Sequence, residues 1–426
     1  MGDLKVKNGG NDTKSNFGRG WTIIGFAALL MFINGIIHTN GINILLNMIN
    51  DMKGWEVSDM LTINTVAGII GVLSSFITGR LIIKFGAKKI GGIYLIAGGL
   101  IIIWFGYLNS LAAFFICMTM LWIFSDGYGQ MVPFTLTANW FPRKKGLALG
   151  WSTMGYPICS ILAVPILLFL IGNTGYSTCF LIIGIVQIII GIVTFFMIHN
   201  YPEEVGIAPD NDPNGLDDLQ KMIEYRKNYR SKLTVKKLLK DPNMWSIAIM
   251  MGLLWMSTIG IVSQLIPRLM AGGYDQSAAT RFLQLSSICG LFGSYFFGWL
   301  DTKIGTRKAT MIYCWFYVAA LLVLAISNSV PATIFVCIFG GLGTGAICNL
   351  LPSYIGTVYG RDDFAIANGV ISPIASMMRC LNFLILGLAL RISGNYTPAY
   401  LIFCAFSIIA SILAVRTKKE FTPVST

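Results

Sequence analysis

The amino-acid sequence predicts an all-α integral membrane protein in which twelve transmembrane helices form two pseudo-symmetric six-helix bundles. Of the 426 residues, 55% are hydrophobic and only 12% are charged, and the mean hydropathy is +0.70. Soluble domains carry about 25% charged residues, so this chain cannot cover a soluble globule with polar surface. Two further observations are twelve apolar stretches of about 20 residues, the length that spans a bilayer, and one polar segment that leaves six stretches on either side.

The twelve apolar stretches have starts that can be read from the sequence. They begin near Trp21, Ser58, Ile90, Leu111, Gly146, Tyr176, Asn243, Ala278, Lys308, Pro331, Ala365 and Pro398. The first stretch is too long for the core of a signal peptide and lacks an obvious cleavage site, so we expect a retained helix. The predicted units are an N-terminal tail (1–20), an N-terminal bundle (21–199), a central loop (200–242), a C-terminal bundle (243–416) and a C-terminal tail (417–426).

Basic residues are distributed unevenly between the two sides of the predicted bundle. The two tails and the loops on their side hold 26 of the 31 lysines and arginines, whereas the opposite loops hold four: Lys53, Arg268, Arg281 and Arg391. Since cytoplasmic loops are enriched in basic residues, both termini and the central loop are predicted to be cytoplasmic in a multi-pass protein of the cell membrane. The net charge of +12 is therefore explained by basic loops next to the lipid bilayer, and no nucleic-acid partner is expected.

The two halves share a pattern in the loops after their second helices. Each loop has a glycine, a cation five residues later, a second glycine and then a basic pair. The residues are Gly79, Lys84, Gly86 and Lys88 in the first half, and Gly298, Lys303, Gly305 and Arg307 in the second. The offset of 219 residues also carries Gly150 onto Gly369. A constant register across several helices indicates an internal repeat, and repeated halves around a midplane site are typical of secondary transporters.

These two loops resemble the signature loop of the major facilitator superfamily, and the resemblance covers the whole chain. Three further segments are similar to the oxalate/formate antiporter and monocarboxylate transporter group: residues 140–146 with Gly150 and Gly155, residues 202–206, and Pro352-Ser353 with Tyr359-Gly360. The resemblance implies the major facilitator fold. It also implies a functional monomer whose halves rock about a central cavity, which opens to each side in turn.

The signature loop departs from the family pattern at one position. The superfamily usually places an aspartate directly before the cation, where this chain has Ile83 in the first half and Thr302 in the second, with Asp301 one residue early. The charge contact between the halves that the resemblance implies is therefore expected to be weakened, or rebuilt, on the N-terminal side.

A second departure concerns the cations that hold the substrate in the oxalate/formate group. The aligned positions are Ser294 in the eighth helix and Ala375 in the eleventh, so neither cation is present. Arg379 lies one helical turn beyond Ala375 and would face the same side. The resemblance then favours a monocarboxylate over a dicarboxylate such as oxalate.

Arg379 and Asp126 are the charged residues placed deepest in predicted spans. Because a charge at this depth costs about 2.5–3.5 kcal/mol to insert, each must face a partner or a wet cavity. Arg379 is predicted to anchor a carboxylate, since its planar fork binds two oxygens; the alternative is a permanent ion pair between helices. Asp126 could neutralise Arg379 in the empty carrier, take up a coupling proton, or cap backbone in a glycine-interrupted helix. Both lie about 21–22 Å along their helices, so similar depths are expected.

The remaining candidates for substrate contact are polar groups within predicted spans. They are His38, which could titrate with a transported proton or simply join two helices, and the weaker candidates Tyr128, Gln130, Gln264 and Tyr354. The sequence contains no phosphate-binding Gly-x-x-x-x-Gly-Lys-Ser/Thr run, and its nine cysteines show neither disulfide nor metal-ligand spacing. We therefore expect no cofactor, no metal ion and no enzyme activity.

The expected function is secondary active transport of a small organic anion, with a monocarboxylate favoured, by antiport or proton-coupled symport. Two alternatives remain open. An exporter of hydrophobic or cationic compounds would depend on Asp126 rather than Arg379. A membrane sensor that retains the carrier fold would bind its ligand without moving it and would signal through the central loop.

Overall fold

The computed structural model describes residues 18–212, 219–229, 231, 233–327 and 329–417, and within these ranges the chain is mostly helical and has no strands. Eight of the membrane crossings are uninterrupted helices. They are α3 (Val57–Phe85), α4 (Ala87–Phe105), α9 (Tyr176–Met197), α12 (Pro242–Ala271), α13 (Gln276–Ile304), α14 (Thr306–Ile326), α15 (Val330–Tyr359) and α18 (Thr397–Arg416).

Four crossings are interrupted near their middle. The first and fourth contain a π-helical segment, and the fifth and eleventh contain a break in the helix. Their parts are α1 (Trp21–Gly35), η2 (Ile36–Gly41) and α2 (Ile42–Lys53); α5 (Leu111–Asp126), η3 (Gly127–Met131) and α6 (Val132–Trp140); α7 (Lys145–Ser152) and α8 (Gly155–Thr174); and α16 (Phe364–Cys380) and α17 (Asn382–Ser393). Every crossing begins at most three residues from its predicted start.

The apolar length of these helices agrees with a membrane-spanning chain. In the described ranges, ten helices are long and apolar enough to cross a membrane. The other two crossings are the first, which is divided into three segments, and α13, whose middle is rich in serine and glycine. The prediction of an all-α membrane protein built from two bundles is confirmed.

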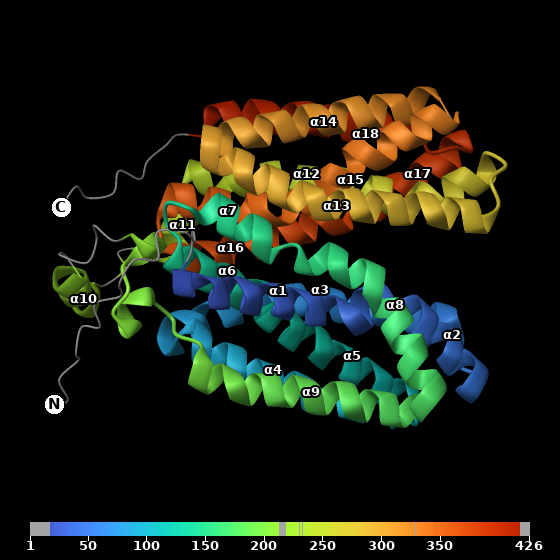
Figure 1. Cartoon of the computed structure of the whole chain (residues 1–426). Coiled ribbons are helices and arrows are strands. Elements are labelled where there is room, and N and C mark those ends of the chain that lie inside the picture. Colours follow the sequence, from blue (N-terminus) through green and yellow to red (C-terminus); the bar gives the residue numbers. More distant parts are fainter. Residues whose placement is uncertain (1–17, 213–218, 230, 232, 328, 418–426) are drawn as a thin grey trace.

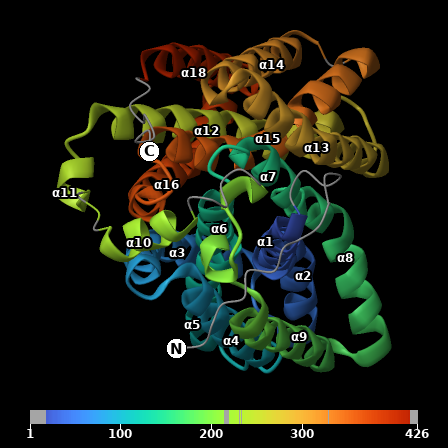
Figure 2. The same cartoon turned by 60° about the vertical axis from the view of Figure 1, so that its left-hand side comes forward.

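The crossings form two bundles that lie side by side (Figure 1), with α1–α9 in one and α12–α18 in the other. The described residues next to both chain ends, together with the short helices α10 (Leu219–Asn228) and α11 (Val235–Leu238), lie at the same end of the molecule. Figure 2 shows this end turned toward the viewer. We name it the terminal face, and the opposite end the far face.

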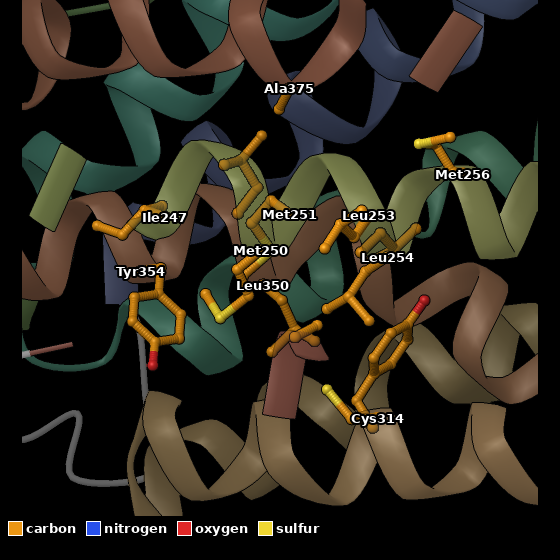
Figure 3. Packing of buried hydrophobic residues seen from close by; sticks show 14 of the residues in the cluster. Ile247, Met250, Met251, Leu253, Leu254, Met256, Cys314, Leu350, Tyr354 and Ala375 are labelled. Atoms are coloured by element: carbon orange, nitrogen blue, oxygen red, sulfur yellow. The ribbon is translucent and has the colours of Figure 1, made fainter. Parts of the chain in front are cut away.

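Each bundle has its own packed interior. Figure 3 shows α12 in the C-terminal bundle, where Met250, Met251 and Leu254 pack against Leu350 and Cys314. Because lipid tails are as apolar as leucine, helices in a membrane associate through close packing rather than through the hydrophobic effect. The α13–α15 pair illustrates this closeness, since a Cβ added at Gly341 would lie 3.0 Å from Ser286 Cα.

The two bundles meet mainly near the terminal face. There α7 packs on α13 and α15, and α3 packs on α16. Among the described residues, α2 and α17, which are the far-face parts of the first and eleventh crossings, make no extensive contact with the opposite bundle. The structure is therefore closed between the bundles at the terminal face and more separated toward the far face.

The segment between the bundles folds back onto the terminal face through η4 (Pro202–Val205) and η5 (Pro209–Asn211). Asp210 has a positive φ of 61°, and its carboxylate accepts hydrogen bonds from the backbone N–H groups of Arg143 at 3.0 Å and Lys144 at 2.8 Å. These N–H groups directly precede α7 and have no partner within that helix. Asp210 thus fixes the loop that leads into the contact between the bundles.

Replacing Asp210 with alanine should lower the stability of the protein by about 1–3 kcal/mol, because two loop N–H groups lose their acceptor. Asp212→Ala is the matched control: its partner Arg143 has an 82% exposed side chain, so we expect a loss below about 1 kcal/mol. Thermal unfolding of the purified protein in detergent measures both. Equal shifts for the two variants would contradict a specific role for Asp210.

The pH dependence of this contact has a defined sign. Burial raises the pKa of the Asp210 carboxyl above its ordinary value, although the N–H groups of Lys144 and Arg143 act in the opposite direction. The folded protein then holds this proton more tightly than the unfolded chain does. The associated stability is complete below the unfolded pKa and is lost as pH rises through the folded pKa, so Asp210 should not make the protein acid-sensitive.

Candidate functional site

Arg379 lies in the last turn of α16, directly before the break in the eleventh crossing. Its guanidinium is 5.4 Å from the ring centroid of Trp255 on α12, a cation–π contact. The backbone carbonyl of Arg379 accepts a hydrogen bond of 2.9 Å from Asn382 Nδ2. The side chain is half-buried, so the charge is held within the C-terminal bundle but is not enclosed.

Asp126 is the last residue of α5, directly before the π-helical segment of the fourth crossing. Its residue is only 8% exposed. The carboxylate accepts a hydrogen bond of 3.5 Å from Gln130 Nε2 and lies near the Ser75 hydroxyl. Arg379 interacts electrostatically with this carboxylate, but in the described part of the chain no direct ion pair joins the two. The two charges thus share one region from opposite bundles.

Tyr156, in the first turn of α8, interacts electrostatically with both charges. Its hydroxyl donates to the Gly129 carbonyl at 3.0 Å and lies near the side chain of Asn34. Asn34 is 5% exposed, and its Oδ1 has no hydrogen-bond partner among the described residues. A buried acceptor without a donor is costly, so this oxygen is suited to a donor group on a bound molecule.

The interruptions of the crossings explain how these polar groups come together. Gly129 lies in the π-helical segment of the fourth crossing, and a Cβ there would lie 2.6 Å from Asn34 Nδ2. Glycine therefore lets α1 approach the fourth crossing closely. π-Helical segments often occur at functional sites, and interrupted helices line the sites of many transporters. We name the group Asn34, Ser75, Asp126, Tyr156, Trp255 and Arg379 the central site.

The other predicted contact residues are placed differently. Tyr128 is buried in the N-terminal bundle, where its side chain lies near Gln187. Tyr354 lies in the interior of the C-terminal bundle (Figure 3), with its hydroxyl 3.4 Å from the Ala414 carbonyl. Gln264 is half-buried on α12, nine residues beyond Trp255. His38 lies in η2, and its side chain is outside the described residues.

Sequence reasoning missed Trp255, Tyr156, Asn34 and Ser75. Single aromatic or small polar residues in an apolar span also occur at lipid-facing and helix-packing positions, so their residue type carried little signal. For Tyr156 a signal existed, because it directly follows Gly155 in one of the segments that carried the family resemblance.

The repeated glycines meet one another across the two bundles. A Cβ added at Gly79 on α3 would lie 2.8 Å from the Cα of Gly369 on α16, and one at Gly298 on α13 would lie 2.7 Å from the Cα of Gly150 on α7. Since 219 residues separate Gly79 from Gly298 and Gly150 from Gly369, the two contacts are related by the internal repeat. The later glycines of the loops, Gly86 and Gly305, have φ of 86° and 87°, which favours glycine.

A polar contact accompanies the glycine contact of the second half. Thr302 Oγ1 accepts a hydrogen bond of 2.9 Å from the backbone N–H of Leu147, and Asp301 accepts from Ser353. In the first half the equivalent positions are the apolar Ile82 and Ile83. A partly buried ion pair joins Arg361, between α15 and α16, to Glu203 in η4. It links the segment between the bundles to the C-terminal bundle, and a rebuilt charge contact at the first-half loop stays a prediction.

The cations of the repeated loops contact their own half. Lys84 Nζ lies 5.1 Å from the ring centroid of Phe85, and the Lys88 backbone N–H donates to Asn200 Oδ1 at 2.8 Å. Arg307 donates to the Val415 carbonyl, and Lys303 is exposed. Among the described residues, none of these four side chains forms an ion pair across the bundles.

Two six-helix bundles with charges of opposite sign within their spans form an architecture typical of secondary transporters. Residues 21–381 match the sequence profile of the Major Facilitator Superfamily, and the chain belongs to that family. Members of this family and fold are transporters rather than enzymes.

Similar proteins agree on the fold and differ in the substrates that their names state. The chain is 24% identical over 264 residues to the membrane sensor protein UhpC of Salmonella typhimurium, covering 58% of this chain and 56% of the relative. It is 23% identical over 301 residues to the oxalate:formate antiporter of Oxalobacter formigenes, covering 69% and 66%. The solved structure of the proton:xylose symporter XylE superposes with a TM-score of 0.75 at 10% identity, covering 94% of this chain and 96% of that one.

Proposed function

We propose that this protein is a secondary active transporter that moves a small organic anion, with a monocarboxylate as substrate, by alternating access. The position of Arg379 carries this proposal. It is an arginine near the middle of a crossing whose guanidinium has an aromatic face on one side and no direct carboxylate partner among the described residues. Its side chain is half-buried and interacts electrostatically with Asp126 of the opposite bundle.

Substrate binding follows from the chemistry of the central site. The carboxylate of the anion pairs with the Arg379 fork, which binds two oxygens in parallel. The substrate's carbon chain lies near Trp255, and Asn34 Oδ1 accepts from a hydroxyl or a proton on the substrate. Because Arg379 belongs to one bundle and Asn34 to the other, a bound anion contacts both halves and its binding is coupled to their relative position.

The orientation predicted from the basic loops assigns each face of the molecule to one side of the membrane. With both termini in the cytoplasm, the terminal face is the cytoplasmic side and the structure is outward-facing. The functional unit is one chain, since each chain contains both halves and the site between them.

Asp126 is the group that would couple transport to a proton. Asp126→Asn should leave exchange of one anion for another largely intact but remove the increase of net uptake at lower external pH, because the neutral amide cannot take up or release a proton. Uptake by proteoliposomes at two external pH values measures both. Normal uptake with an unchanged pH dependence would exclude Asp126 as the proton site.

The test of the proposed function is uptake into proteoliposomes that contain the purified protein and are preloaded with unlabelled carboxylates. Labelled formate, lactate, pyruvate and oxalate are screened at two pH values. Uptake that requires an internal anion indicates antiport, and uptake driven by a pH gradient alone indicates symport. Absence of uptake for every carboxylate would reject the proposal.

Two alternatives have defined outcomes in the same preparation. An exporter of hydrophobic or cationic compounds would transport a lipophilic cation and would depend on Asp126. A sensor is favoured by one observation, the similarity to UhpC. It would bind a carboxylate, detected as a shift in thermal unfolding, without any uptake.

A further inference from the structure

The terminal face contains a cavity of about 380 Å³ that is separate from the central site. It lies between the loop that precedes α14, the terminal-face ends of α15 and α18, and the start of α7. Tyr354, predicted to line the substrate cavity, lines this one instead. A volume of this size accommodates a small organic molecule.

The lining of this cavity is strongly basic. Four cations contribute to it against a single carboxylate: Arg143, Lys145, Arg307 and Lys308 against Asp301. Arg307 donates through one guanidinium nitrogen to the Val415 carbonyl, which leaves most of its five N–H donors for other partners. Clustered charge of one sign in a walled cavity raises the local concentration of the opposite ion.

The carboxylate of Asp301 is already engaged with protein groups. It accepts a hydrogen bond from the Ser353 hydroxyl and interacts electrostatically with Lys145. Its residue is only 6% exposed. Because Arg143 pairs with Asp212, the positive charge available to a ligand comes mainly from Arg307 and Lys308, together with the start of α14, whose dipole also favours an anion.

The internal repeat supplies a comparison site within the same chain. The first-half equivalent of Thr302 is Ile83, which lines a pocket of only about 20 Å³ between α3 and α16. The first half keeps the basic pair itself, since Lys88 and Lys89 stand at the positions of Arg307 and Lys308. The Lys88–Lys89 loop therefore serves as a charge-matched comparison for the cavity.

The cavity is built from both bundles. Arg143 and Lys145 belong to the N-terminal bundle, and Arg307 and Lys308 to the C-terminal bundle. An anion that contacts both pairs would bind best while the bundles are in contact at the terminal face. Such a ligand would favour this state over one in which the bundles separate there.

We infer that this cavity binds a phosphomonoester group and thereby stabilises the state closed at the terminal face. A phosphomonoester carries a charge of about −1.5 to −2 at pH 7 and three acceptor oxygens, which suits the Arg307 fork and its neighbouring cations better than one carboxylate would. The remaining volume holds the organic part of the ligand. The phosphate comes either from a soluble metabolite or from a lipid headgroup.

Equilibrium binding distinguishes the two sources. The purified protein is titrated with glycerol 3-phosphate in detergent, and separately reconstituted into nanodiscs of phosphatidylcholine with or without phosphatidic acid, with thermal unfolding as the readout. Saturable stabilisation by glycerol 3-phosphate indicates a soluble ligand. Stabilisation by phosphatidic acid alone indicates a lipid. No stabilisation by either probe would overturn the inference.

Variants matched by the repeat test the location of the site. The double variant Arg307→Gln/Lys308→Gln should weaken binding by about tenfold or more, because two charge-assisted hydrogen bonds are lost. Lys88→Gln/Lys89→Gln removes the same charges from the equivalent loop and should change binding by less than about twofold. Equal weakening in both would indicate a diffuse basic surface and reject the cavity.

A measurement on the wild-type chain does not depend on how the variants fold. Trypsin cleaves after Arg307 and Lys308, and an occupied cavity should slow this cleavage relative to cleavage after Lys88 and Lys89. Unchanged relative rates at a saturating probe concentration would contradict binding at this site. None of these experiments requires transport, so their failure is distinguishable from failure of the proposed function.

Discussion

Replacing Arg379 with glutamine should lower carboxylate uptake by about 100-fold or more. Two charge-assisted hydrogen bonds of about 1.5–3 kcal/mol each would be lost, and each 1.4 kcal/mol is a factor of ten in binding. Arg379→Lys should recover only part of this loss, because an ammonium group is a point charge and cannot bind two oxygens in the planar arrangement of a guanidinium.

The matched control for this prediction lies in the same crossing. Arg391 is near the end of α17, where it is exposed, so Arg391→Gln removes an arginine of similar type without altering the central site. We expect uptake within about twofold of wild type, as for most exposed charges. Initial uptake rates over a range of substrate concentrations give both values. Full activity of Arg379→Gln would reject Arg379 as the residue that binds the substrate carboxylate. It would favour the alternative in which Asp126 binds a cationic substrate.

Loss of uptake in Arg379→Gln must be separated from loss of folding. An uncompensated Asp126 would remain in the central site of this variant, and an unpaired buried charge is destabilising. The double variant Arg379→Gln/Asp126→Asn removes both charges. It should restore the unfolding temperature but not the uptake, because the carboxylate of the substrate still lacks its partner.

The helices were predictable because their determinant is local. An apolar run of about 20 residues is sufficient to place a crossing, and every crossing begins within three residues of its predicted start. The interruptions were less predictable, because Gly127 and Gly129 indicate a weakened helix but not a π-helical segment. That geometry depends on the close approach of Asn34, which belongs to another crossing.

The central site was predictable only for its charges. Arg379 and Asp126 are conspicuous because a charge in a membrane is costly wherever it lies. Trp255 and Tyr156 become informative only when the fold places them beside those charges. Tyr354 was a candidate because it is a polar residue on a helix expected to line the cavity. In the structure its hydroxyl instead lies 3.4 Å from the Ala414 carbonyl of its own bundle.

The glycine contacts between the bundles yield the second prediction of large effect. Gly79→Ala places a Cβ 2.8 Å from Gly369 Cα, which is closer than such atoms approach in folded proteins. Since the opposing atom belongs to backbone and cannot rotate away, α3 and α16 must separate. We expect the equilibrium between the two states of the carrier to shift away from closure at the terminal face, while each bundle keeps its internal packing.

Reaction of Cys348 with a membrane-impermeant maleimide measures this shift. Cys348 is half-buried on α15 and interacts electrostatically with Arg379, so its labelling reports access to the central site. In wild-type vesicles labelling should occur mainly from the far face. In Gly79→Ala it should increase several-fold from the terminal face. All variants are made in a Cys380→Ser background, because Cys380 is exposed, and a further Cys348→Ser substitution should remove the increase.

The internal repeat provides a second variant that should have the same effect. Gly298→Ala meets Gly150 Cα at 2.7 Å and should shift labelling in the same direction as Gly79→Ala, because both contacts close the same face. Gly387→Ala is the control, since a Cβ there meets nothing within 4 Å, and its labelling should match wild type. Opposite effects of Gly79→Ala and Gly298→Ala would mean that the two glycine contacts do not both stabilise closure at the terminal face. The polar contacts of Thr302 and Arg361 would then have to hold the terminal face closed without it.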